Sequence, residues 1–215
     1  MIFDYTIDSP ATAHSRLVLA HGAGASMQSD FMQHMSSLLC ERGIEVVRFN
    51  FEYMQTIQQT GKRRPPEKAD KLLSHFSALL AHLESTYCAL PLFIGGKSMG
   101  GRMATLLLPD SLARGAVVFG YPFHPPGKPE KLRTAHLLQP DKPVCILQGE
   151  RDTFGTRAEL PGFKLAATVE VNWLPDGDHS LKPRKSSGYT YQTNMQSAAE
   201  YAASFIHTHT TQVNL

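Results

Sequence analysis

A Gly-x-Ser-x-Gly motif occupies residues 96–100, with Ser98 at its centre and Gly96 and Gly100 on either side. A serine hydroxyl is a poor nucleophile until a neighbouring base accepts its proton, and the base must in turn be oriented by an acid. In the sharp turn that presents such a serine, the two glycines keep open a space that side chains would fill. The residue types and their spacing therefore predict nucleophilic acyl transfer at Ser98.

The sequence on either side of the motif predicts a strand–turn–helix unit. An apolar run of strand length, Leu92–Ile94, leads into it, and a helix-compatible segment, Arg102–Leu108, follows it and stops at Pro109. Ser98 would then stand at a helix N-terminus, where backbone N–H groups and the helix dipole favour negative charge. An oxyanion formed during acyl transfer gains from both.

Two other glycine-rich patterns fit the sequence less well. A phosphate-binding P-loop that ends at Ser98 needs its first glycine at position 91, which is Pro91. A dinucleotide fingerprint that begins at Gly22 needs its third glycine at position 27, which is Met27. No nucleotide cofactor is predicted.

Candidate partners for Ser98 lie in two later loops. Asp152 follows the apolar run Val144–Leu147, and His179 follows the run Val169–Leu174. Loops that follow parallel strands meet at one edge of a sheet, and Ser, then Asp, then His is a known chain order for such a triad. We therefore expect His179 to accept the Ser98 proton and Asp152 to hold the imidazole in the required tautomer.

Three other acidic residues compete with Asp152. Glu150 lies in the same loop, and Asp176 and Asp178 precede His179. Asp178 adjoins the histidine in sequence, but adjacent side chains rarely aim at each other well, whereas a residue from a separate loop can reach the far ring nitrogen. Asp152 is preferred for this reason, and the other three are interpreted as solvated loop charges.

Two backbone N–H groups are expected to stabilise the developing oxyanion. The first would come from Met99, directly after the nucleophile. The second would come from Ala23, with Gly24 as the alternative, in the loop after the run Leu17–Ala20. His21, at the start of this loop, is expected to brace it by hydrogen bonding rather than to do chemistry.

His21, Lys97 and His124 are also candidates for lining a substrate pocket. His124 lies in a proline-rich segment and is equally consistent with an exposed loop position. Cys145 lies in the middle of an apolar run, so it is interpreted as a core residue and not as a nucleophile.

The elements that would position these residues alternate along the chain. Six short apolar runs bounded by glycine or proline are typical of strands buried on both faces of a parallel sheet. They are Leu17–Ala20, Glu45–Phe49, Leu92–Ile94, Ala116–Phe119, Val144–Leu147 and Val169–Leu174. Apolar residues at helical spacing over 31–39, 72–83 and 195–206 predict core-facing helices between or after them. The pattern predicts an α/β fold with a mostly parallel central sheet and helices on both faces.

Two segments, Met54–Pro66 and Tyr121–Lys131, are interpreted as long loops. The first contains a basic cluster, Gly61–Arg64, which is interpreted as a solvated loop rather than an anion site. Neither an internal repeat nor a linker rich in Gly and Ser divides the sequence. Residues 1–215 are therefore predicted to form a single domain.

The composition excludes several classes of protein. With 21 basic and 19 acidic residues the formal charge is +2, which gives no electrostatic reason to expect nucleic acid or a membrane surface as partner. The three cysteines, Cys40, Cys88 and Cys145, suggest neither a disulfide framework nor a zinc site, and reduced thiols favour a cytoplasmic location. The N-terminal segment shows no signal peptide, and no run of about 18 apolar residues predicts a membrane helix.

Taken together, these motifs resemble those of the α/β-hydrolase superfamily. Within it, the sequence is similar to a small group that includes testis-expressed protein 30, the related C-terminal part of a histone-acetyltransferase complex subunit, and bacterial relatives described as predicted hydrolases. The stretches that carry the resemblance are His21–Ala25, Arg48–Phe51, Gly61–Pro66, Gly95–Arg102, Gly120–Pro129, Gln148–Gly155 and Gly177–Ser180.

The resemblance implies an α/β-hydrolase fold with Ser98 as nucleophile, Asp152 as triad acid and His179 as base, and it implies no metal and no organic cofactor. One departure from larger members is visible. No long insertion follows the run Ala116–Phe119, where a lid domain usually sits, so we expect an open cleft without a large lid.

The function expected from residues and resemblance is a serine hydrolase that cleaves a carboxylic ester or thioester through an acyl-enzyme, with a small ester-like molecule as its partner. Two alternatives remain: a non-catalytic binding or regulatory protein on the same scaffold, and a peptide or amide hydrolase. A haloalkane dehalogenase is disfavoured because that chemistry needs a carboxylate where Ser98 stands. The oligomeric state is not predicted.

Overall fold

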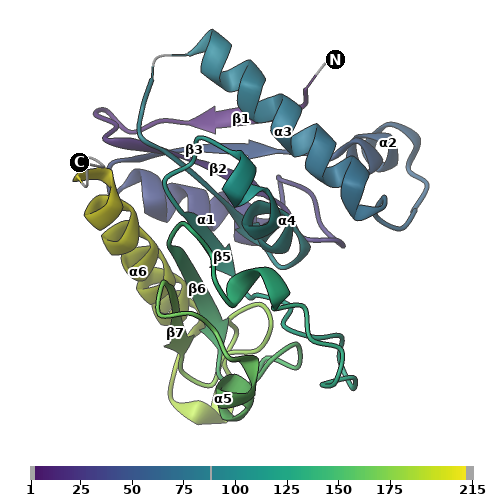
Figure 1. The fold of residues 1–215 in the computed structure, drawn as a ribbon, viewed down its shortest axis with the longest axis vertical. Coiled ribbons are helices and arrows are strands. Elements are labelled where there is room, and N and C mark those ends of the chain that lie inside the picture. The colour runs from purple at the N-terminus through teal and green to yellow at the C-terminus, as the bar shows by residue number, and fades with distance from the viewer. Residues whose placement is uncertain (1–2, 88, 212–215) are drawn as a thin grey trace.

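The computed structural model describes residues 3–87 and 89–211. Its central feature is a seven-stranded sheet in the order β1-β3-β2-β4-β5-β6-β7 (Figure 1). The strands are β1 (Tyr5–Asp8), β2 (Ser15–Ala20), β3 (Ile44–Phe49), β4 (Leu92–Lys97), β5 (Ala116–Phe119), β6 (Val144–Gly149) and β7 (Val169–Leu174). The helices are α1 (Asp30–Cys40), α2 (Glu52–Thr60), α3 (Ala69–Thr86), α4 (Met99–Leu107), α5 (Leu160–Phe163) and α6 (Tyr191–Thr211).

Every neighbouring pair in the sheet from β3 to β7 is parallel, and only β1 pairs antiparallel, with β3. The six predicted strands are confirmed. Strand β1 was not predicted from the sequence, and its four residues are all half-buried. An edge strand with only one neighbour and alternating polar residues lacks the continuous apolar run that marks the central strands.

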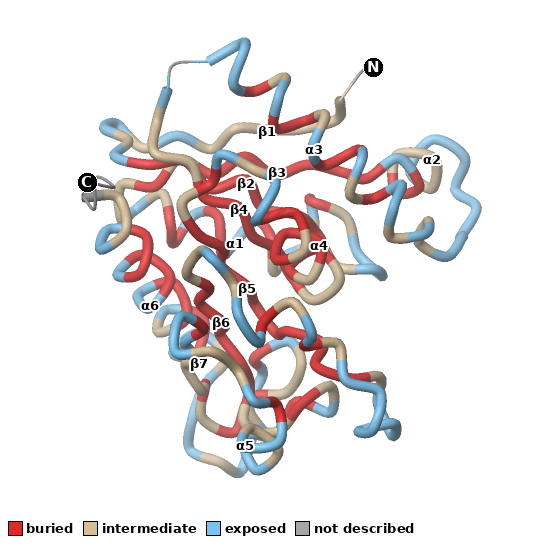
Figure 2. Tube along the Cα trace, in the orientation of Figure 1, coloured by how far each residue is buried: buried red, intermediate tan, exposed pale blue. Residues whose placement is uncertain are grey.

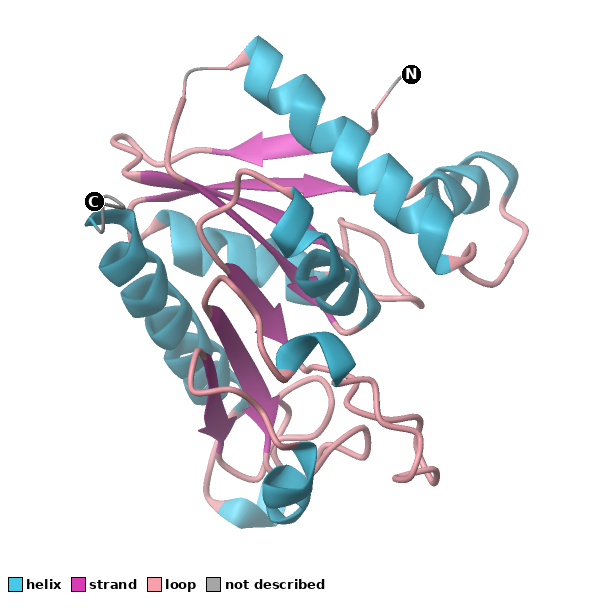
Figure 3. Cartoon of the chain, in the orientation of Figure 1, coloured by secondary structure: helices cyan, strands magenta, loops and turns pink. Residues whose placement is uncertain are grey.

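The sheet is covered on both faces, as predicted (Figures 1 and 3). Successive strand residues point to opposite faces. On β2, Val18 and Ala20 join the core cluster formed with α3 and α4. Leu17 and Leu19 join the second cluster, formed with α1 and α6. Figure 2 shows the resulting pattern, with the central strands buried and the outer sides of the helices exposed.

The interpretation of Met54–Pro66 as one loop is wrong for its first half. Residues 54–60 belong to α2, which ends at Gly61 in the left-handed conformation (φ 69°). Tyr53 and Met54 are buried, so tertiary packing of two apolar residues stabilises a helix whose remaining sequence is largely Gln and Thr. The basic cluster at 61–64 is exposed and irregular, as interpreted.

The connection from β5 to β6 contains a single 3-10 turn, η2 (Ala135–Leu137), and otherwise consists of turns and irregular backbone. No lid domain is therefore inserted between these two strands, in agreement with the prediction. Among the helices that the structure describes, none combines the length and apolar character that crossing a bilayer requires. Cys88 and the first two residues of the N-terminal segment lie outside the described ranges.

Candidate active site

Ser98 lies between the end of β4 and the start of α4. Its backbone adopts φ 52° and ψ −113°, a conformation that L-residues avoid and that costs of order 1–3 kcal/mol. The Ser98 N–H donates to the carbonyl of Phe119 on the neighbouring strand, which fixes the turn to the sheet. The backbone strain is therefore maintained by the surrounding structure and presents the hydroxyl at the edge of the sheet.

Close backbone approach explains the two glycines of the motif. A Cβ placed on Gly96 would lie 2.5 Å from the carbonyl oxygen of Ala20. A Cβ on Gly100 would lie 2.5 Å from the carbonyl oxygens of both Ala20 and His21. Since real Cβ atoms do not approach backbone this closely, any side chain at either position would push β2 away from the turn.

The three predicted catalytic side chains converge at the carboxyl edge of the parallel strands. His179 Nε2 lies 2.7 Å from Ser98 Oγ, and His179 Nδ1 lies 2.8 Å from Asp152 Oδ2. An ionised carboxylate only accepts hydrogen bonds, so Nδ1 donates to Asp152, and Nε2 is left to accept from the serine hydroxyl. This is the relay geometry that activates a serine.

Asp152 is fully buried and its acceptor capacity is well used. Oδ2 also accepts from Gln148 Nε2 at 2.8 Å, and Oδ1 accepts from the Phe154 N–H at 2.9 Å. A buried carboxylate is tolerable only when hydrogen bonds replace its hydration. The contacts also fix the direction of the carboxylate toward His179.

The His179 side chain is partly accessible, with 25% of its surface exposed. Its ring lies against the ring of Phe154, with the centroids 4.2 Å apart. Phe154 therefore contacts the triad twice, through its N–H to Asp152 and through its ring to His179.

The rival acids are held in the structure of their own loops. Glu150 accepts from the Asp176 N–H, Asp176 pairs with Arg151 and Arg184, and Asp178 Oδ1 accepts from the N–H groups of Ser180 and Lys182. The interpretation of these carboxylates as solvated loop charges is wrong in this respect: they shape the turns around His179 and are not merely hydrated. Each is committed to a partner other than the imidazole.

The loop His21–Ala25 lies directly beside the serine. A Cβ placed on Gly22 would be 3.8 Å from the Cβ of Ser98 and 3.6 Å from the carbonyl oxygen of Lys97. Tyr53 donates to the carbonyl of Ala23 at 3.0 Å, which fixes this part of the loop. Met99 is the first residue of α4, so its N–H has no partner within the helix.

His21 braces this loop, as expected, and has no exposed surface with which to line a pocket. Nδ1 donates to the carbonyl of Gly22 at 2.6 Å, and Nε2 accepts from the Phe51 N–H at 3.2 Å. Burial lowers the pKa of His21 to about 4. A neutral ring therefore links the ends of β2 and β3.

A family model described as an alpha/beta hydrolase domain matches residues 13–207. The chain belongs to the alpha/beta hydrolase family. The match covers every element from β2 through most of α6. The wider part of the predicted resemblance is thereby confirmed.

This α/β-hydrolase shares its fold with proteins of solved structure whose sequence identity to it is low. It is similar to an α/β serine hydrolase homologue from Coxiella burnetii, with a TM-score of 0.71 and 17% identity over 94% of this chain and 90% of that chain. It is similar to an α/β serine hydrolase without a lid from Xanthomonas campestris, with a TM-score of 0.68 and 17% identity over 94% and 89%. It is also similar to an esterase domain from Rhodothermus marinus, with a TM-score of 0.65 and 12% identity over 95% and 98%.

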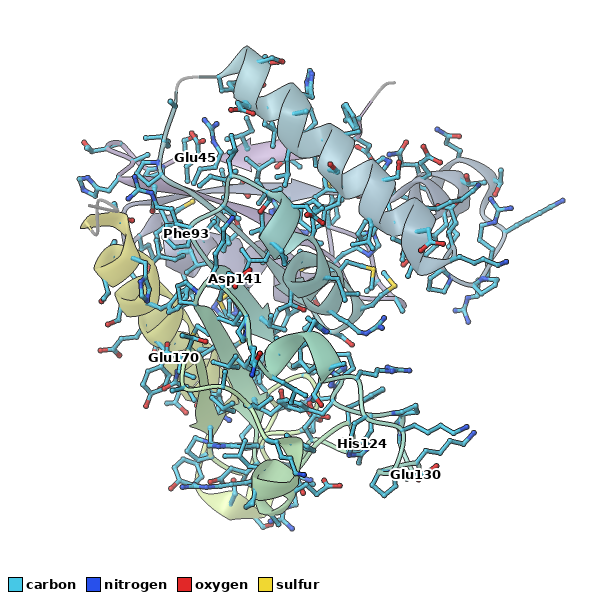
Figure 4. The ribbon with its side chains drawn as sticks, viewed as in Figure 1. Glu45, Phe93, His124, Glu130, Asp141 and Glu170 are labelled. Carbon is cyan, nitrogen blue, oxygen red and sulfur yellow. The ribbon has the colours of Figure 1, made fainter. Side chains whose placement is uncertain are left out.

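The other two residues predicted to line a pocket of this hydrolase, His124 and Lys97, are buried as well. His124 lies in the loop between β5 and β6, and Figure 4 shows Glu130 further out on the same loop. His124 Nδ1 lies 2.9 Å from the carbonyl oxygen of Pro125, and His124 Nε2 lies 3.1 Å from Glu159 Oε1. His124 therefore connects this loop to the segment before α5. Lys97 is 9% exposed, and its ammonium donates to the backbone carbonyl of His179.

Cys145 is fully buried in β6 of the hydrolase, where burial raises the pKa of its thiol. This agrees with its interpretation as a core residue, since a thiolate is the reactive form. Within residues 3–87 and 89–211, no group of three or more His, Cys, Asp or Glu side chains is arranged to hold a metal ion.

Two residues that contact the triad, Gln148 and Phe154, were not predicted from the sequence. Gln148 is fully buried, accepts from the Tyr121 N–H at 2.7 Å, and donates to Asp152. A polar residue at the end of an otherwise apolar strand was a usable signal for a buried hydrogen-bonding role. Phe154 gave no such signal, because an aromatic residue in a loop is ordinarily interpreted as packing.

Proposed function

We propose that this α/β-hydrolase family member is a serine hydrolase that cleaves a carboxylic ester or thioester through an acyl-enzyme on Ser98. The single observation that carries the proposal is the pair of distances from His179: 2.7 Å to Ser98 Oγ and 2.8 Å to Asp152 Oδ2. The strained backbone of Ser98 supports it, because a purely binding scaffold has no need to maintain that cost.

In the proposed reaction, Ser98 Oγ attacks the carbonyl carbon of the substrate while His179 Nε2 accepts the hydroxyl proton. The tetrahedral oxyanion accepts hydrogen bonds from the N–H groups of Met99 and Ala23. The bond from carbon to the leaving oxygen or sulfur breaks, and the imidazolium gives its proton to the leaving group. Water then attacks the acyl-enzyme, its proton passes to His179 and on to Ser98 Oγ, and the carboxylic acid departs.

Several further assignments belong to this proposal. Residues 1–215 act as one domain, the location is cytoplasmic, and neither nucleic acid nor membrane is a partner. Catalysis uses no metal and no organic cofactor. The motif stretches from His21–Ala25 to Gly177–Ser180 support placing the chain with the testis-expressed protein 30-like group. Ester hydrolysis is favoured over peptide or amide hydrolysis because one structurally similar protein is an esterase domain.

The decisive experiment compares the wild type with Ser98→Ala in labelling by a fluorophosphonate probe, which reacts with an activated serine. We expect covalent labelling of the wild type and none of the variant, whose serine oxygen is gone. The same pair is assayed on p-nitrophenyl esters of graded acyl length. The kcat of the variant is expected to fall by at least about 10³-fold, because a triad acts as a unit and fails when one member is removed. An unlabelled, inactive wild type would refute the proposal.

A further inference from the structure

The turn from β4 into α4 at residues 96–100, called the elbow below, carries one charged side chain that takes no part in the proposed reaction. Lys97 is the last residue of β4 and directly precedes the nucleophile. Only 9% of its surface is exposed, although lysine is among the residues least often buried. Its burial within a few ångströms of the triad therefore calls for a reason.

The ammonium of Lys97 reaches across the end of β5 to the histidine loop. It donates a hydrogen bond to the backbone carbonyl of His179 itself. Gly120 makes this reach possible: a Cβ on Gly120 would lie 2.9 Å from Lys97 Nζ, 2.8 Å from the His179 carbonyl oxygen and 3.3 Å from His179 Nδ1. The Lys97 ammonium therefore lies where three segments meet. These are the elbow, Gly120 after β5, and the loop after β7 that carries His179.

The charges around the ammonium come from two loops. Asp152, in the loop after β6, and Asp178, in the loop after β7, both favour the charged lysine. The ring of Phe31 on α1 lies 5.5 Å from Nζ. Burial is the larger influence and lowers the pKa of Lys97 to about 8. Folding therefore retains a cation that a methionine of similar length would replace without the cost of desolvation.

We propose that Lys97 is a positioning residue for the catalytic base. Its ammonium fixes the His179 backbone, and hence holds the imidazole between Ser98 and Asp152. Its positive charge also offsets the negative charge of Asp178. This inference rests on the proposed function. It assigns Lys97 no contact with the substrate, which separates it from the residues that perform the chemistry.

Two measurable consequences follow from the charge. Without the ammonium, its positive charge no longer opposes protonation of the imidazole beside Asp152, so the pKa of His179 should be higher in a variant that lacks the charge. A unit charge within a few ångströms at a partly buried site changes a pKa by about one unit. The acidic limb of the pH–rate profile should move upward by the same amount, because only the neutral imidazole accepts the serine proton.

The test compares wild type, Lys97→Met and Lys97→Arg on a p-nitrophenyl ester from pH 5 to pH 10, with Lys71→Met, an exposed lysine on α3, as the matched control. For Lys97→Met we expect kcat to fall at least about tenfold, with KM changed less than about threefold. The midpoint of the acidic limb of the pH–rate profile should move to higher pH by about one unit. The Tm should stay equal or increase. Lys97→Arg should restore the position of the acidic limb, because the charge is retained. Lys71→Met should match the wild type.

A second measurement does not depend on turnover. In the Ser98→Ala background, NMR titration of the His179 imidazole, assigned with His179→Gln, should give a midpoint about one unit higher when Lys97 is replaced by Met. If the wild type is neither labelled nor active, the proposed function fails, and this titration still tests Lys97. An unchanged His179 midpoint, or an activity loss that accompanies only a lower Tm, would overturn the inference and leave Lys97 a structural residue.

Discussion

At the scale of single residues, the site depends on how each polar atom is committed. Asp152 is fully buried, and its two oxygens accept hydrogen bonds from His179, Gln148 and the Phe154 N–H. Glu150, a few residues earlier, is committed to the Asp176 N–H and to Arg157 instead. Two carboxylates of one loop therefore have different tasks, which burial and hydrogen-bond partners assign.

This difference predicts opposite outcomes for two conservative substitutions. Asp152→Asn preserves the shape but presents an amide that can donate to Nδ1 and stabilise the wrong histidine tautomer. We expect kcat to fall by about 10⁴-fold while substrate binding changes little. Glu150→Gln retains an oxygen acceptor for the Asp176 N–H and should stay within about threefold of wild-type kcat. Steady-state kinetics on the best p-nitrophenyl ester measures both, and equal losses in the two variants would contradict the assignment of Asp152.

At the scale of elements, the elbow is a joint between β4, α4 and the end of β2. Gly96 and Gly100 let these backbones meet at distances that exclude a side chain. The strained φ of Ser98 persists because its N–H is tied to Phe119 on β5. Positioning of the hydroxyl is thus a property of three packed elements and not of the five-residue motif alone.

A matched pair of glycine substitutions tests this packing. Gly100→Ala places a methyl group 2.5 Å from two backbone carbonyl oxygens, so we expect a loss of about 3 kcal/mol or more in the free energy of unfolding. Gly162→Ala, in α5, meets no atom within 4 Å and should change stability by less than about 1 kcal/mol. Urea unfolding followed by circular dichroism compares them, and equal stabilities would show that β2 gives way freely.

At the scale of the whole molecule, two apolar cores enclose the sheet, and some ionisable groups are buried with it. His21 has no exposed surface and its pKa is lowered to about 4 by burial. The pKa of His136 is also lowered to about 4, by burial and then by the Arg102 charge. Both rings are neutral in the fold at pH values where they would be protonated in the unfolded chain.

The fold should therefore lose stability on acidification. A histidine with a depressed folded pKa contributes its full stability above the unfolded value near 6.5 and loses it as the pH falls toward 4, because the unfolded chain binds the extra proton. For His21 alone the loss amounts to about 3 kcal/mol at most. Calorimetry at pH 7 and pH 4.5 should show a drop in Tm that is smaller in His21→Asn. An equally large drop in that variant would assign the acid sensitivity to other groups.

The sequence by itself determined the chemistry-bearing residues and the class of fold. Apolar runs of strand length indicate strands that are buried on both faces of a sheet. A parallel sheet places the loops that follow these strands at one edge, so Ser98, Asp152 and His179 could be selected from the sequence. The residues and the fold class could be predicted because they depend on residues close together in the sequence. The Gly-x-Ser-x-Gly spacing reflects the geometry of the turn, and the apolar periodicity reflects which side of each strand or helix is buried.

Only the tertiary structure decided what each remaining polar group does. The contact of the Phe154 ring with His179 and the hydrogen bond from Lys97 to the His179 carbonyl join segments far apart in the chain, and Gln148 reaches Asp152 across the turn after β6. The burial of His124 against Glu159, and of Tyr53 and Met54 in α2, likewise depends on neighbours that no local pattern specifies. Such contacts are set by packing across the sheet, and packing depends on every element at once.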